Sequence, residues 1–147
     1  MRYFGICVGA STISAVELSR GNPVPKIERV ILKTHEGNAR KTLEEVLNGL
    51  KINSGDSIAV TGRKFRNFIN LSSITEPEAV EKAYEFVANG EKYSAIVSAG
   101  GETFMVYSLD DIGKISNVYT GNKCASGTGE FFLQQIRRMD LTIEDAM

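Results

Sequence analysis

The chain has 147 residues, of which 42% are hydrophobic, so it can form one domain or two small ones. Its 17 Lys and Arg residues nearly balance its 18 Asp and Glu residues, and the net charge of -1 argues against a nucleic-acid partner. No apolar run approaches the roughly 20 residues of a membrane span, so no membrane partner is expected either. Two cysteines are too few for a disulfide framework, which favours a reducing, cytoplasmic location.

The first half of the chain predicts a sheet with two helices. Apolar runs rich in strand formers end at Gly-containing turns, and other stretches repeat apolar residues at helical spacing. Thr75 can cap a helix, Glu78 can close a capping box and Pro77 suits a first helical turn. The predicted strands are Arg2–Val8, Ile13–Leu18, Lys26–Thr34 and Ser57–Thr61. The predicted helices are Arg40–Leu50, with Leu43, Val46, Leu47 and Leu50 on one face, and a second from Thr75 to near Asn89, with Val80, Tyr84 and Val87 on one face.

The second half repeats the pattern of the first. Strand, Gly turn, strand, turn, strand and helix follow one another from Tyr3 to Leu50 and again from Tyr93 to Met139. Two such units facing each other could clamp a phosphate chain between the backbone N–H groups of their Gly turns. We predict a first nucleotide-binding lobe at residues 1–92 and an incomplete second lobe at residues 93–147. The strands predicted in the second lobe are Tyr93–Val97, Thr103–Leu109 and Lys114–Tyr119, followed by a helix from about Thr128 to Met139.

A Gly-rich stretch with a cysteine enters the last predicted helix. It runs from Gly121 to Phe132 and contains Cys124 just before a turn of small residues. Free backbone N–H groups at a helix N-terminus can bind an anion, and the helix dipole favours thiolate over thiol. The stretch therefore predicts an anion site beside a reactive or metal-binding sulfur. A Gly-rich turn with a buried structural cysteine is the simpler alternative.

With these motifs, the chain resembles the nucleotide-binding fold shared by actin, sugar kinases and heat-shock ATPases. This is a ribonuclease H-like α/β fold, and the chain would supply one lobe and the βββα start of a second. More closely, the chain is similar to the ATP-dependent activators of 2-hydroxyacyl-CoA dehydratases and to the ATPase subunits of benzoyl-CoA reductases. The segment Asn122-Lys123-Cys124-Ala125-Ser126-Gly127-Thr128-Gly129 resembles the family signature Asp-Lys-Cys-Ala-Ala-Gly-Thr-Gly. Supporting matches are Gly5-Ile6-Cys7-Val8-Gly9-Ala10-Ser11, Val60-Thr61-Gly62 and Gly100-Gly101-Glu102.

The resemblance implies a function. In that family, ATP with Mg²⁺ binds between two lobes, and a [4Fe–4S] cluster bridges a homodimer through two cysteines from each subunit. The cluster passes an electron to an acyl-CoA dehydratase, the partner enzyme. The resemblance assigns Cys124 to the cluster and assigns nucleotide binding to Gly9, Ala10, Ser11, Thr12, Gly100, Gly101, Glu102, Gly127, Thr128 and Gly129.

The end of the chain predicts a fragment. Thr142-Ile143-Glu144-Asp145 looks like an N-cap and an acidic first helical turn. The resemblance places the second cluster cysteine beyond Met147. We therefore expect these 147 residues to be the N-terminal part of a longer protein.

Three positions depart from the family pattern. Cys7 and Thr103 stand where the family usually has Asp, and Ser14 stands where it usually has Lys. Because Mg²⁺ prefers hard oxygen ligands, we expect ATP hydrolysis to be weakened or lost, and we assign no catalytic residue. The alternatives are a nucleotide-binding or regulatory module without turnover, and a structural lobe in which Cys124 is inert.

Two further residues have simple interpretations. Cys7 is expected to be a small apolar residue at a strand end rather than a ligand. His35, the only histidine, follows a strand in a polar loop and is expected at the surface.

Overall fold

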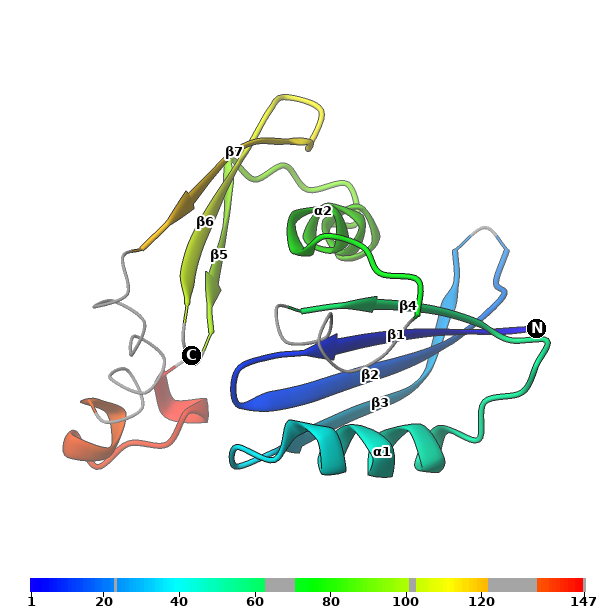
Figure 1. The fold of residues 1–147 in the computed structure, drawn as a ribbon. Coiled ribbons are helices and arrows are strands. Elements are labelled where there is room, and N and C mark those ends of the chain that lie inside the picture. Colours follow the sequence, from blue (N-terminus) through cyan, green and yellow to red (C-terminus); the bar gives the residue numbers. More distant parts are fainter. Residues whose placement is uncertain (23, 63–70, 101–102, 122–134, 147) are drawn as a thin grey trace. The chain divides into compact units, whose positions relative to one another are not determined.

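The computed structural model describes residues 1–22, 24–62, 71–100, 103–121 and 135–146. It is a mixed α/β fold that divides into two compact units, Met1–Asn89 and Gly90–Met147 (Figure 1). The assignment of residues 1–92 and 93–147 to two nucleotide-binding lobes stays a prediction.

The first unit is built on a four-stranded sheet. Its strands are β1 (Arg2–Val8), β2 (Thr12–Ser19), β3 (Lys26–Thr34) and β4 (Ser57–Thr61), in the order β3-β2-β1-β4. β1, β2 and β3 pair as antiparallel neighbours, and β4 pairs in parallel with β1. The chain reaches β4 through α1 (Ala39–Leu50), because a parallel pairing requires a crossover. The predicted bounds of β1, β3 and β4 are confirmed residue for residue.

One face of this sheet and α1 form the core. Alternate residues of each strand face α1, so Phe4, Ile6 and Val8 of β1 are buried, whereas Tyr3, Gly5 and Cys7 lie on the opposite face. The predicted apolar stripe of α1 is confirmed, because Leu43, Val46 and Leu50 are buried and Leu47 packs against the same cluster. Burial of each such side chain contributes about 1.5–3 kcal/mol relative to exposure. The core cluster consists of Phe4, Ile6, Val8, Ile13, Ala15, Ala39, Leu43, Val46, Leu50 and Val60.

The second helix, α2 (Glu76–Val87), begins beside β4. The N–H of Val60 donates to Ser72 O at 3.1 Å, and the N–H of Ile74 donates to Val60 O at 2.9 Å. Thr75 then caps α2, as predicted, by accepting the N–H of Glu78 at 3.4 Å. The predicted apolar face is only partly confirmed, since Val87 is exposed.

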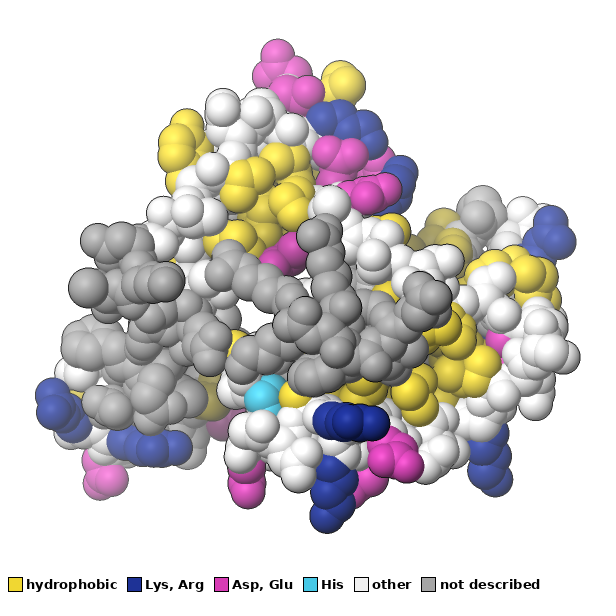
Figure 2. Space-filling view, viewed as in Figure 1, with side chains coloured by type: hydrophobic (Ala, Val, Ile, Leu, Met, Phe, Trp, Pro, Cys, Tyr) yellow, Lys and Arg dark blue, Asp and Glu magenta, His cyan; other side chains and the backbone are white. Residues whose placement is uncertain are grey.

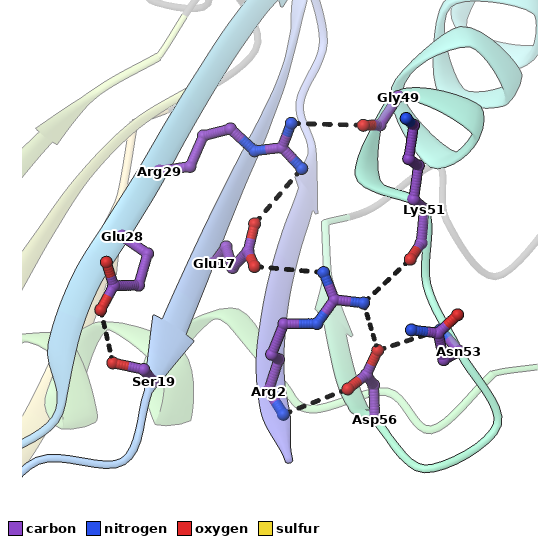
Figure 3. A network of polar contacts seen from close by, with 9 residues as sticks. All are labelled: Arg2, Glu17, Ser19, Glu28, Arg29, Gly49, Lys51, Asn53 and Asp56. Atoms are coloured by element: carbon purple, nitrogen blue, oxygen red, sulfur yellow. Dashed lines mark hydrogen bonds and ion pairs between the residues drawn. The ribbon is translucent and has the colours of Figure 1, made fainter.

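A network of ion pairs and hydrogen bonds connects the start of β1 with β2, β3 and the end of α1 (Figure 3). The Arg2 guanidinium lies 2.7 Å from Asp56 Oδ2 and 3.3 Å from Glu17 Oε1, and it donates to Lys51 O at 2.9 Å. Arg29 lies 3.3 Å from the other oxygen of Glu17. The contacts of Arg2 with Asp56 and Lys51 hold the start of β1 to the chain that follows α1, and Glu17 joins Arg2 of β1 to Arg29 of β3.

The second unit contains an antiparallel sheet of β5 (Ala95–Ala99), β6 (Phe104–Leu109) and β7 (Ile115–Thr120). β5 begins two residues later than predicted and continues to Ala99, because Ala99 pairs with Phe104 where the hairpin closes. Of the helix predicted from Thr128 to Met139, residues 135–138 are described and are helical. The 3₁₀ helix η3 (Glu144–Ala146) follows Thr142, whose Oγ1 accepts the N–H of Asp145 at 3.2 Å.

Two surface properties bear on function. On the face shown in Figure 2, basic and acidic side chains are interspersed over the described surface. Among the described residues, no helix has the length and hydropathy needed to span a membrane.

Candidate functional site

The turn between β1 and β2 is a tight hairpin at the first predicted phosphate site. The N–H of Gly9 donates to Thr12 O at 2.8 Å, which leaves Ala10 and Ser11 as the two loop residues. A Cβ atom on Gly9 would lie 3.0 Å from Thr12 O. Glycine therefore suits this close approach of two backbone segments, because a Cβ atom would force Thr12 O to shift by a few tenths of an ångström.

The turn between β5 and β6 repeats this geometry. The N–H of Gly100 donates to Thr103 O at 2.8 Å, and a Cβ atom on Gly100 would lie 3.1 Å from that oxygen. The repeat predicted from the sequence pattern is therefore also a repeat of turn geometry. Gly101 and Glu102, the two loop residues of this turn, lie outside the described residues.

The hydrogen bonds of the first turn leave donors available. The carbonyl of Thr12 accepts from Gly9, the carbonyl of Ser11 accepts from the backbone N–H of His35 at 3.0 Å, and the carbonyl of Gly9 lies 3.3 Å from His35 Nε2. Within the described part of the chain, the N–H groups of Ala10 and Ser11 donate no hydrogen bond. A turn in which three carbonyls have partners and two N–H groups are available is suited to an anion.

The expectation that His35 lies at the surface is wrong. The residue is 4% exposed, and its ring lies against the Gly9–Thr12 turn. β3 ends at Thr34, and the chain then reverses through Glu36 and Gly37, which have φ values of 45° and 88°. This reversal carries His35 inward. Its polar neighbours in sequence suggested a solvated loop, and only the pairing of β2 with β3 brings it to the turn.

Cys7 stands in a row of three side chains on the face of the sheet opposite α1. It pairs in register with Ser14 of β2 and with Thr61 of β4. Burial raises the pKa of the Cys7 thiol, and the nearby Glu76 carboxylate raises it further. The Oγ1 atom of Thr61 is buried and has no hydrogen-bond partner within the described residues. The row therefore presents a thiol and two hydroxyl groups.

This row does not fit Mg²⁺. A neutral thiol is a poor ligand for a cation that prefers oxygen, and none of the three side chains is a carboxylate. Glu76, in the first turn of α2, is close enough to act on the Cys7 thiol. Proximity to Cys7 arises because the segment before α2 runs alongside β4.

Curated relatives share sequence with most of this chain. No protein-family model matches the chain. The chain is 28% identical over 148 aligned residues to the activator of lactoyl-CoA dehydratase from Anaerotignum propionicum, which covers 99% of this chain and 56% of that relative. It is 25% identical over 134 residues to the 2-hydroxyisocaproyl-CoA dehydratase activator of Clostridioides difficile, which covers 89% of this chain and 50% of that relative. The chain is homologous to the activators of 2-hydroxyacyl-CoA dehydratases. It spans about half the length of the curated activators it matches.

Solved structures establish the fold. The activator of the 2-hydroxyisocaproyl-CoA dehydratase from Clostridium difficile, solved with bound ADPNP, matches with a TM-score of 0.72 at 22% identity, over 97% of this chain and 53% of that one. An exopolyphosphatase from Cytophaga hutchinsonii matches with a TM-score of 0.62 at 13% identity, over 90% of this chain and 53% of that one. The predicted actin-like ATPase fold is thereby confirmed.

Several predicted site residues lie outside the described residues. They are Gly101, Glu102, Cys124, Gly127, Thr128 and Gly129, and their roles stay predictions. Among the described residues, no group of three or more His, Cys, Asp or Glu side chains could hold a metal ion. The described site residues are Gly9, Ala10, Ser11, Thr12 and Gly100.

Proposed function

We propose that this chain is the N-terminal part of an ATP-dependent activator that passes an electron from a dimer-bridging [4Fe–4S] cluster to a 2-hydroxyacyl-CoA dehydratase. The observation that carries the nucleotide half of this proposal is the Gly9–Thr12 turn. The carbonyls of Gly9, Ser11 and Thr12 have hydrogen-bond partners, whereas the N–H groups of Ala10 and Ser11 have none within the described residues. A phosphate supplies the oxygen acceptors that such groups need. The ADPNP bound in a solved activator supports the same ligand class here.

The resemblance assigns phosphate contacts to Gly9 to Thr12 and to Gly100 to Glu102. It assigns further contacts to Gly127, Thr128 and Gly129. The row of Ser14, Cys7 and Thr61 does not fit Mg²⁺, so no hydrolytic step is assigned to it. This misfit favours the second candidate function, a nucleotide-binding or regulatory module without turnover.

The proposed binding of a [4Fe–4S] cluster depends on Cys124. The raised pKa of the Cys7 thiol disfavours the thiolate that an iron–sulfur cluster requires, so Cys7 is not a proposed ligand. Two copies of this chain would supply two Cys124 thiolates, and a cluster takes four. The remaining two would come from outside these 147 residues. When bound, the cluster would supply the electron. Cysteines that are not paired in disulfides suit a reducing, cytoplasmic location.

Anaerobic reconstitution tests the cluster. The full-length natural protein is treated with iron and sulfide, and the broad visible absorbance of a cluster is recorded for wild type, Cys124→Ser and the control Cys7→Ser. We expect absorbance in wild type and in Cys7→Ser, and its loss in Cys124→Ser. A wild-type protein that forms no cluster would contradict the electron-transfer function.

ATP binding and hydrolysis separate the two candidate functions. Calorimetry measures the affinity of the same protein for ATP, and phosphate release measures turnover with and without Mg²⁺. Binding together with hydrolysis supports the activator, whereas binding without hydrolysis supports the regulatory module. No ATP binding would contradict both.

A further inference from the structure

His35 contacts the Gly9–Thr12 turn at two points. Its backbone N–H donates to Ser11 O at 3.0 Å, and its ring Nε2 lies 3.3 Å from Gly9 O. The residue is 4% exposed, so the ring is packed against the turn and not solvated. No role in this site was expected for it from the sequence.

A third contact defines the tautomer of the ring. The N–H of Gly37 donates to His35 Nδ1 at 3.2 Å, so Nδ1 must carry a lone pair. The ring proton therefore resides on Nε2, from which it is donated to Gly9 O. The positive φ of Gly37 is part of the chain reversal that turns its N–H back toward the ring.

From these contacts we infer that His35 is a positioning residue of the nucleotide site. The ring orients the N–H of Ala10 toward a bound phosphate by holding the carbonyl of Gly9. This inference rests on the nucleotide binding proposed above.

The geometry of the peptide group explains the effect. The carbonyl of Gly9 and the N–H of Ala10 belong to one planar trans peptide, so they point in opposite directions. A donor that holds the carbonyl on the side of His35 fixes the N–H on the other side. In the same way, the bond from the His35 backbone to Ser11 O sets the peptide that carries the N–H of Thr12.

Because residue 9 is a glycine, the hydrogen bond from the His35 ring is needed to fix the orientation of the Gly9–Ala10 peptide. Gly9 has no Cβ, so the Gly9–Ala10 peptide can rotate more easily than a peptide after another residue. A rotated peptide would present its carbonyl oxygen to the phosphate, where two negative partial charges repel. The ring of His35 selects the orientation that binds.

Two substitutions separate this role from a general contribution to stability. In His35→Gln the side-chain NH₂ can replace Nε2 as the donor to Gly9 O, whereas in His35→Asn the shorter amide can replace only Nδ1. For the full-length natural protein, we expect His35→Gln to bind ATP within about twofold of wild type, and His35→Asn to bind about 3- to 10-fold more weakly. Thermal unfolding is measured for both, and we expect similar midpoints. Equal ATP affinity of both variants and wild type would overturn the inference and leave the proposed nucleotide binding intact.

Nuclear magnetic resonance tests the same contact without nucleotide. Long-range proton–nitrogen spectra of the ring should show the proton on Nε2, and the amide signal of Ala10 should move more in His35→Asn than in His35→Gln. A ring protonated on Nδ1, or an Ala10 signal unchanged in both variants, would overturn the inference. A wild-type protein that binds no ATP contradicts the proposed function, and these spectra then decide separately whether His35 orients the turn.

Discussion

Gly62 lies so close to Val8 that a Cβ atom on Gly62 would be 2.2 Å from the carbonyl oxygen of Val8. Gly62 also has a φ of 106°, which side chains other than glycine rarely permit. The contact joins the end of β4 to the end of β1, one residue before the Gly9–Thr12 turn. The backbone that supports the turn is therefore held at a position that admits only glycine.

The first prediction follows from this contact. Gly62→Ala should lower the free energy of unfolding by about 2–4 kcal/mol, because the new Cβ atom meets rigid backbone in an unfavourable conformation. Urea unfolding measures the change. Gly49→Ala is the matched control, because Gly49 lies in α1 with no atom within 4 Å of the added Cβ, and we expect a gain of about 0.5–1 kcal/mol there. Similar effects of both substitutions would contradict the proposed role of the contact.

The second prediction concerns the equivalence of the two Gly turns. Added Cβ atoms at Gly9 and Gly100 would meet Thr12 O and Thr103 O at 3.0 and 3.1 Å. Gly9→Ala and Gly100→Ala should therefore each cost about 1 kcal/mol of stability, the lower end of the usual cost of overpacking. Thermal unfolding of the two variants checks this. A cost at one turn and none at the other would show that the two turns differ.

The sheet of the first unit could be predicted from the sequence because local patterns decide it. β1 and β4 place apolar side chains on the α1 face, and turns bound them clearly. The stripe of α1 is equally local, since residues three and four apart share a face. In the second unit β5 was displaced by two residues, because its extent depends on pairing with β6 and not on its own composition.

The candidate site could be predicted only in part. The Gly turns are visible in the sequence because the close approach of two backbone segments favours glycine at positions 9 and 100. His35 was missed because its burial results from strand pairing and a chain reversal, which leave no periodic pattern. The effect of Glu76 on Cys7 was not predicted, because it depends on the path of the chain beside β4.

The third prediction tests the substitution at the end of β1. Cys7→Asp should introduce the carboxylate that the resemblance implies for Mg²⁺, and it should raise Mg²⁺-dependent ATP hydrolysis above that of wild type. Without metal, burial and the nearby Glu76 should destabilise the new carboxylate and cost about 1–3 kcal/mol of stability. Cys7→Ser is the control and should change neither property by much. Hydrolysis that stays at the wild-type level in Cys7→Asp with saturating Mg²⁺ would show that more than this ligand is missing.

The last prediction concerns the acid dependence of stability at the start of β1. The N–H of Asn53 and the guanidinium of Arg2 lower the pKa of Asp56 from 3.8 to about 2. Because the pKa is lower in the folded state, the contribution of Asp56 is complete above about pH 4 and is lost as the pH falls through about 2. Asp56→Asn should therefore be less stable than wild type at pH 7, and the difference should shrink between pH 4 and pH 2.

Urea unfolding at pH 7, 4, 3 and 2 measures this difference. Glu45→Gln is the matched control, because Glu45 pairs with Lys33 at 3.3 Å on an exposed surface, where an ion pair contributes at most about 1 kcal/mol. We expect that substitution to change stability by less than about 0.5 kcal/mol at every pH. A difference between wild type and Asp56→Asn that stays constant down to pH 2 would mean that the ionised carboxylate does not stabilise the fold. The contact of Arg2 with the carbonyl of Lys51 would then account for the attachment of β1 to the end of α1.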